Sequence, residues 1–255
     1  MRTPRFLTTA FKAVEEAERI TLSYFRRGAK ITIKPDSTPV TEADRKAEEA
    51  VKKILHRAFP DHAIFGEEFG WLGNPDSEYV WIVDPIDGTK SFIRKIPLWG
   101  NLLALVYRGE VVLGVSNVPQ QKELLWAEKG KGAFLNRKRV QVSKVSRPEE
   151  SMMSFGSLNA FRKNGLETQL LTLLHSTHRQ RAFGDLWQYH LVATGRTEAA
   201  LETGIQSFDV APFFCIIKEA GGKASDLFGN PFTMQISSFA ATNGKLHSVV
   251  TGSFK

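Results

Sequence analysis

Two aspartates three residues apart are the residues of this chain that most directly indicate chemistry. They are Asp84 and Asp87, in the segment WIVDPIDGT at residues 81–89. Residues 79–83 are all aromatic or β-branched, which predicts a buried strand ending just before Asp84. Because Pro85 stiffens the bend, both carboxylates can converge beyond the strand. Clustered carboxylate oxygens are the ligands that hard divalent cations need, so the segment predicts a cation site.

Two further acidic positions strengthen this prediction. Glu67 follows the apolar residues 63–65, and Asp209 stands at the start of an apolar segment. Each acid alone has an ordinary interpretation, as a solvated loop charge, a turn former or a helix cap. Together with the backbone N–H groups and hydroxyl offered by Gly88 and Thr89, they indicate cations placed between carboxylates and an anionic ligand. This arrangement is typical of Mg²⁺-assisted phosphoryl transfer.

Alternating helices and strands are expected around these residues. The segment at residues 31–40 suits a hairpin or an irregular connection, from which Lys34 could approach the site or simply remain exposed. Thr41 to Asp44 resembles a capping box. We expect helices at 3–28, 41–59, 166–175, 186–194 and 209–220 and from about 244, and strands at 79–83, 102–107, 111–118, 123–127, 152–155 and 198–201. This alternation favours an α/β or layered α+β fold.

The chain is large enough for a substantial core. It has 255 residues, of which 42% are hydrophobic, which suits one large domain or two coupled subdomains. The polar stretch at 140–147 predicts subdomains at residues 1–145 and 146–255. The single cysteine, Cys215, excludes an internal disulfide and a multi-cysteine zinc site.

Charge and hydropathy limit the partners. The net charge of +7 could attract nucleic acid, but the basic residues are scattered, and a positive field would equally steer a phosphorylated substrate. No apolar run approaches the roughly 20 residues of a membrane span, and no signal peptide is recognisable. We therefore expect a cytoplasmic protein without a membrane partner.

Three motifs resemble those of the inositol monophosphatase superfamily, Mg²⁺-dependent and lithium-sensitive phosphomonoesterases. Residues 66–68 match the first motif, and residues 81–89 match the second, which is highly specific. Residues 207–211 and 219–222 match the third, with Phe208 where the family usually has Trp. The resemblance covers nearly the whole chain. It implies a layered αβαβα sandwich with the site between the two subdomains, and a homodimer.

The resemblance also implies roles for individual residues. Two or three Mg²⁺ ions would bind, with Mn²⁺ as a possible substitute. The first ion would take Glu67, Asp84 and the Ile86 carbonyl, the second would take Asp84, Asp87 and Asp209, and a weaker third would lie near Glu67. Thr89 and Glu67 would orient the attacking water, Asp44 would support them while also capping its helix, and the Gly88 and Thr89 N–H groups would bind phosphate.

The substrate is predicted from the second half of the chain. Gly184, Asp185 and Glu202 match substrate-facing positions of the family, and Asp209 would also face the substrate. Two carboxylates suit a cationic alcohol, and residues 154–158 and 184–185 resemble the histidinol-phosphatase branch. Histidine biosynthesis is then the expected context. The alternatives are an inositol-1-monophosphatase or broad-specificity phosphatase, with Asp185 merely capping a helix, and a binding partner of RNA or the transcription machinery.

Overall fold

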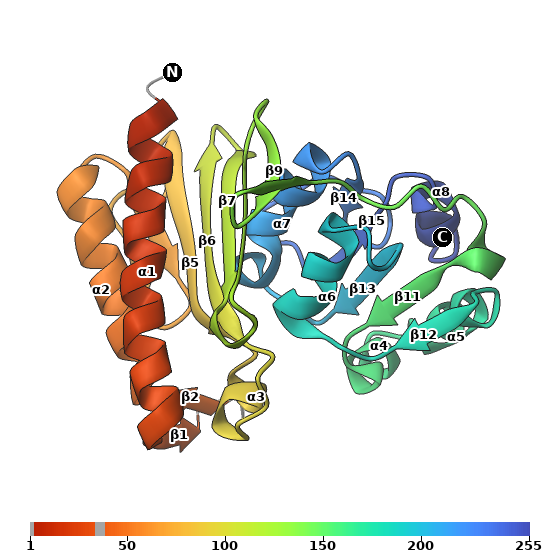
Figure 1. The fold of residues 1–255 in the computed structure, drawn as a ribbon, viewed down its shortest axis with the longest axis horizontal. Coiled ribbons are helices and arrows are strands. Elements are labelled where there is room, and N and C mark those ends of the chain that lie inside the picture. The colour runs from red at the N-terminus through yellow and green to blue at the C-terminus, as the bar shows by residue number, and fades with distance from the viewer. Residues whose placement is uncertain (1–2, 34–38) are drawn as a thin grey trace.

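The protein is a five-layer sandwich in which helices and sheets alternate. The computed structural model describes residues 3–33 and 39–255, so Lys34 lies outside the described residues. The first layer is α1 (Thr3–Arg27) with α2 (Glu42–Ala58), and an eight-stranded sheet is the second (Figure 1). The third layer is α6 (Asp185–Ala193) with α7 (Ser207–Glu219), and a five-stranded sheet is the fourth. The fifth layer consists of α4 (Leu158–Lys163), α5 (Glu167–His175) and α8 (His247–Gly252). The αβαβα fold class is thereby confirmed.

The eight-stranded sheet carries most of the acidic motifs. Its spatial order is β10-β9-β8-β7-β6-β5-β3-β4, and only β3 and β5 are parallel. The strands are β3 (Ala63–Gly66), β4 (Gly70–Leu72), β5 (Tyr79–Asp87), β6 (Gly100–Tyr107), β7 (Glu110–Val118), β8 (Glu123–Glu128), β9 (Gly132–Leu135) and β10 (Lys138–Val140). The expected hairpin of residues 102–118 is confirmed as β6 and β7.

The five-stranded sheet is formed entirely by the later part of the chain. Its order is β12-β11-β13-β15-β14. The strands are β11 (Met152–Phe155), β12 (Arg179–Arg181), β13 (Ala199–Thr203), β14 (Lys223–Ser225) and β15 (Ser238–Thr242). The proposed boundary near residue 145 falls between the strands of the two sheets, and the division into two subdomains remains a prediction.

Short elements connect these layers. Strands β1 (Ile31–Ile33) and β2 (Pro39–Thr41) pair antiparallel, which favours the first of the two expectations for this segment, a hairpin, over an irregular connection. A five-residue helix, α3 (Thr89–Ile93), follows β5 directly, and 3-10 turns lie at Pro119–Gln121 and Pro148–Glu150. Among the described residues, the structure contains no helix with the length and apolarity needed to cross a bilayer.

Helix α7 forms the centre of the main core. Its Phe213 and Ile216 are fully buried with Ile82 and Leu102 of the first sheet. The opposite face of that sheet buries Trp81 beneath α1 and α2. Each such side chain contributes about 1.5–3 kcal/mol by leaving water. The packing therefore fixes α7, and with it Asp209, against the sheet that carries Asp84.

Some boundaries differ from the sequence-based expectation. The last helix begins at His247 rather than near residue 244. Helices α3 and α4 and strands β3, β4, β9, β10, β12, β14 and β15 were not expected. Strand β15 has the sequence SFAAT and is buried at every position. Apart from Phe239 its side chains are small, and they give no alternating pattern, so its pairing with β13 on one side and β14 on the other is set by tertiary packing.

Candidate active site

A β-bulge in β5 places the two aspartates on one face of the sheet. The strand continues to Asp87, so the expectation that it ends before Asp84 is wrong. Asp84 pairs with Leu102 of β6 and Asp87 with Gly100, which leaves two residues of β5 opposite the single Asn101. Residues three apart in a regular strand face opposite sides, and the extra residue corrects this alternation. The Asn101 side chain fixes the bulge by donating to the Pro85 carbonyl at 2.7 Å.

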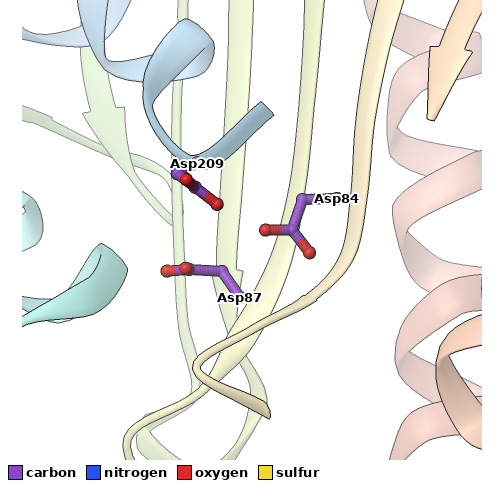
Figure 2. Close-up of side chains that lie close together, drawn as sticks. All are labelled: Asp84, Asp87 and Asp209. Carbon is purple, nitrogen blue, oxygen red and sulfur yellow. The ribbon is translucent and has the colours of Figure 1, made fainter. Parts of the chain in front are cut away.

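Three carboxylates meet at the end of this strand. Asp84 and Asp87 come from β5, and Asp209 comes from the first turn of α7 (Figure 2). One oxygen from each lies within 4.8 Å of the others. Asp209 also accepts from the Gln206 N–H at 2.6 Å, so its capping role and its place in the cluster coexist.

This cluster is electrostatically unfavourable by itself. Burial, followed by the charges of Glu67, Asp87 and Asp209, raises the pKa of Asp84 well above its ordinary value. Burial and the charge of Asp185 raise the pKa of Asp87 in the same way. Buried carboxylates of like charge need compensation. The donor set consists of oxygens only, which fits a hard divalent cation.

Thr89 lies beside this cluster at the first position of α3. The turn into α3 passes through Gly88, whose φ of 82° is in the left-handed region that favours glycine. Thr89 Oγ1 lies 2.9 Å from the Ile86 carbonyl and 3.3 Å from Asp44 Oδ1. Asp44 Oδ2 accepts from the Thr41 N–H at 2.8 Å, so the predicted capping box is confirmed. Burial raises the pKa of Asp44 to about 6.

The cluster forms one wall of a cleft of ≈ 1110 Å³. Both halves of the chain contribute to the cleft, and Asp44 lies behind it, in contact with Thr89. The other site residues expected from the sequence all line it: Glu67, Asp84, Ile86, Asp87, Gly88, Thr89, Gly184, Asp185, Glu202 and Asp209.

Asp185 faces Gly88 across the cleft and does not cap α6. A Cβ placed on Gly88 would lie 3.2 Å from Asp185 Oδ2. The N-cap of α6 is Gly184, and the first-turn N–H of Leu186 donates to Asp87 Oδ2 at 2.5 Å. The capping interpretation of Asp185 is therefore wrong, because the carboxylate that accepts from the first turn of α6 belongs to Asp87 of β5. Burial raises the pKa of Asp185 to about 6, against the opposing effect of Lys90.

Two residues that sequence reasoning missed hold Glu202. Gln188 Nε2 and Tyr189 Oη donate to Glu202 Oε2 at 2.6 and 2.9 Å. The other oxygen lies over Gly156, where a Cβ would come within 2.0 Å of it. Burial, then the charge of Asp185, raises the pKa of Glu202 to about 8. In the sequence, the neighbouring polar residues Gln188 and Tyr189 stand among the apolar residues of α6, and this pattern could have indicated that they hydrogen-bond to a buried partner.

Known proteins are similar to this chain over most of its length. The model of the inositol monophosphatase family matches residues 4–255. A histidinol-phosphatase of Mycobacterium tuberculosis is 37% identical over 96% of this chain and 95% of that protein. An inositol-1-monophosphatase of Synechocystis sp. is 36% identical over 82% of this chain and 74% of that protein. The structure of the extragenic suppressor protein suhB from Bartonella henselae aligns with a TM-score of 0.91 at 28% identity, covering 98% of each chain.

Proposed function

Since the chain belongs to the inositol monophosphatase family, we propose that it is a divalent-cation-dependent phosphomonoesterase acting on a small phosphorylated alcohol. The observation that carries this proposal is the meeting of Asp84, Asp87 and Asp209 on the wall of the cleft. An anionic phosphate cannot approach three carboxylates without intervening cations, because like charges repel strongly where water is excluded.

The cation ligands are proposed from the residues that line the cleft. Two Mg²⁺ ions would be held by Glu67, Asp84, the Ile86 carbonyl, Asp87 and Asp209, with a weaker third ion near Glu67. Mn²⁺ also binds oxygen ligands and would substitute. When bound, these ions would neutralise the carboxylates, hold the phosphate and lower the pKa of the attacking water.

Thr89 is proposed to orient the water nucleophile. Its hydroxyl has one proton, and the Ile86 carbonyl, 2.9 Å away, accepts it. The hydroxyl oxygen therefore retains lone pairs for a water molecule in the cleft. Glu67 would accept the second proton of that water and so align its oxygen with phosphorus. Asp44 Oδ1, 3.3 Å from Thr89 Oγ1, is the second acceptor within reach of that proton.

The phosphate would lie at the start of α3. The chain turns there through Gly88, and the N–H groups of Gly88 and Thr89 are the proposed donors. A side chain on Gly88 would come within 3.0 Å of the Leu98 carbonyl and 3.2 Å of Asp185 Oδ2. Only glycine therefore leaves this turn open to an anion.

We propose histidinol phosphate as the substrate. The support is the pair of carboxylates Asp185 and Glu202, both in the cleft and both with raised pKa values. A cationic alcohol would favour their ionised forms, whereas a neutral polyol would not. The histidinol-phosphatase of M. tuberculosis is similar over nearly the full length of both chains. Inositol 1-phosphate is the alternative, supported by the Synechocystis relative.

Phosphate release from a panel of substrates tests both parts of this proposal. Histidinol phosphate, inositol 1-phosphate, fructose 1,6-bisphosphate and a phosphoadenosine phosphate would each be assayed with Mg²⁺ and with EDTA. Loss of activity in EDTA is expected, with kcat/KM highest for histidinol phosphate. Asp185→Asn should raise KM for histidinol phosphate more than for inositol 1-phosphate. Faster hydrolysis of inositol 1-phosphate by the wild type would contradict the substrate assignment while leaving the reaction class intact.

A homodimer is part of the proposal. The edge of the eight-stranded sheet at β4 exposes Trp71 and Leu72, each 40% accessible, beside Phe69 at 52%. Exposed apolar side chains on an edge strand favour association with another chain. Light scattering should give twice the mass of one chain, and Trp71→Lys should shift the protein to the monomer.

A further inference from the structure

A buried carboxylate outside the cleft contacts the segment that carries Glu67. Glu48 lies on α2 and is 0% exposed. It follows Asp44 by four residues, so both side chains lie on the same face of the helix, about one turn apart. Asp44 contacts Thr89. One face of α2 therefore contacts both segments expected to orient the water nucleophile.

Glu48 makes two hydrogen bonds to the backbone just after Glu67. Its Oε2 accepts from the Glu68 N–H at 2.7 Å, and its Oε1 accepts from the Phe69 N–H at 3.1 Å. These bonds fix the turn between β3 and β4. The Glu67 N–H donates to the Val83 carbonyl of β5 at 3.2 Å, so the backbone at Glu67 is held from both sides.

Lys52 completes this arrangement. Its Nζ lies 3.0 Å from Glu48 Oε1 and donates to the Gly70 carbonyl at 2.9 Å. Lys52 is 9% exposed, so both members of the ion pair are withdrawn from water. A buried ion pair is often no more stabilising than a pair of apolar side chains of similar size. A contribution to fold stability therefore explains the buried Glu48–Lys52 pair poorly, whereas positioning of the turn between β3 and β4 explains it specifically.

Gly66 provides the space that Glu48 occupies. A Cβ on Gly66 would lie 1.9 Å from Glu48 Oε1, so an added methyl group must displace the carboxylate. The φ of Gly66 is not in the left-handed region, so alanine adds this contact without backbone strain. Glycine before Glu67 is thus explained by the approach of Glu48.

We propose that Glu48, held by Lys52, is a positioning residue for Glu67. It fixes the turn that follows Glu67 so that the Glu67 carboxylate faces the cleft in a cation-binding position. This inference rests on the proposed cation-dependent phosphatase function. Groups that orient a metal ligand commonly change metal affinity or activity about 10–100-fold when removed. We expect a change of this size on losing Glu48.

Glu48→Gln is the primary test. The amide replaces one acceptor oxygen by a donor, so one of the two backbone N–H groups loses its partner. Mg²⁺ is titrated into the metal-free protein by isothermal titration calorimetry, and a weakening of at least about 10-fold is expected. The melting temperature in EDTA is measured alongside, because a merely structural role would lower it without changing the cation affinity of the folded protein. Glu49→Gln, at the exposed neighbouring position, is the matched control.

Two further variants keep the test decisive if Glu48→Gln folds poorly. Glu48→Met/Lys52→Met replaces the buried ion pair with apolar side chains, and Gly66→Ala displaces the Glu48 carboxylate while retaining every charge. Both should weaken Mg²⁺ binding and lower kcat at saturating substrate, with KM changed less than kcat. Wild-type Mg²⁺ affinity in any folded member of the three would overturn the inference. A wild-type protein that hydrolyses no phosphomonoester would instead refute the proposed function, and the titrations would still decide the role of Glu48 in cation binding.

Discussion

Replacing Glu202 by glutamine should remove a large pH dependence from the stability of the metal-free protein. The pKa of Glu202 is raised from its ordinary value of 4.5 to about 8, first by burial and then by the charge of Asp185. The folded protein therefore keeps a proton that the unfolded chain releases. The stabilisation from this proton is complete below pH 4.5 and is lost as pH rises toward about 8. At about 1.4 kcal/mol per pH unit, the loss reaches about 3 kcal/mol at pH 7.

Urea unfolding monitored by tryptophan fluorescence measures this loss directly. Wild type and Glu202→Gln are compared in EDTA at several pH values between 4.5 and 8, because bound cations would change the titration. The free energy of unfolding of the wild type should fall by about 3 kcal/mol more than that of the variant between pH 4.5 and 7. Titrating groups that do not interact with Glu202 behave alike in both proteins, so they cancel in this difference.

The same substitution should impair the proposed reaction. Glutamine cannot supply the negative charge that a cationic alcohol would meet, so KM for histidinol phosphate should rise while the metal-free protein gains stability near neutral pH. Parallel pH profiles for the two proteins would refute the reasoning. They would show that Glu202 ionises normally and that the cleft near Tyr189 and Gln188 does not disfavour charge.

Three further outcomes are expected. Thr89→Val should lower kcat by about 10²-fold or more in the phosphate-release assay, because the hydroxyl that orients the water is lost; an unchanged kcat would contradict that role. Mg²⁺ at 100 times its Kd should raise the free energy of unfolding by about 2.7 kcal/mol, and Asp84→Asn should abolish this gain while stabilising the metal-free protein; a gain retained in the variant would place the cation elsewhere. Gly114→Ala should destabilise by about 1–3 kcal/mol in urea, because its Cβ would lie 2.2 Å from the Pro212 carbonyl. Gly252→Ala, which meets no atom within 4 Å, should stay within about 0.5 kcal/mol of wild type, and equal effects of the two substitutions would contradict the packing argument.

Local sequence was sufficient for the main helices and for the acidic motifs. The apolar stripes of α1 and α2, the capping box at Asp44 and the run of residues ending in Asp84 are all encoded within a few turns or one strand. The expected helices and the capping box agree with the structure because helix caps and hydrophobic periodicity act between neighbouring residues. The strand was also located correctly, but β5 continues past Asp84 to Asp87. The family motifs added Asp209, which no local pattern connects to Asp84.

The tertiary structure decided how these residues meet. The bulge opposite Asn101 depends on strand pairing, and it determines that Asp84 and Asp87 share one face of the sheet. The cap of α6 comes from Asp87, 99 positions before Leu186 in the chain, which no local pattern could indicate. Glu48 likewise contacts the turn after Glu67 only because α2 packs on the sheet. The sequence by itself determined which side chains can bind cations, whereas pairing and packing between distant segments determined which of them converge.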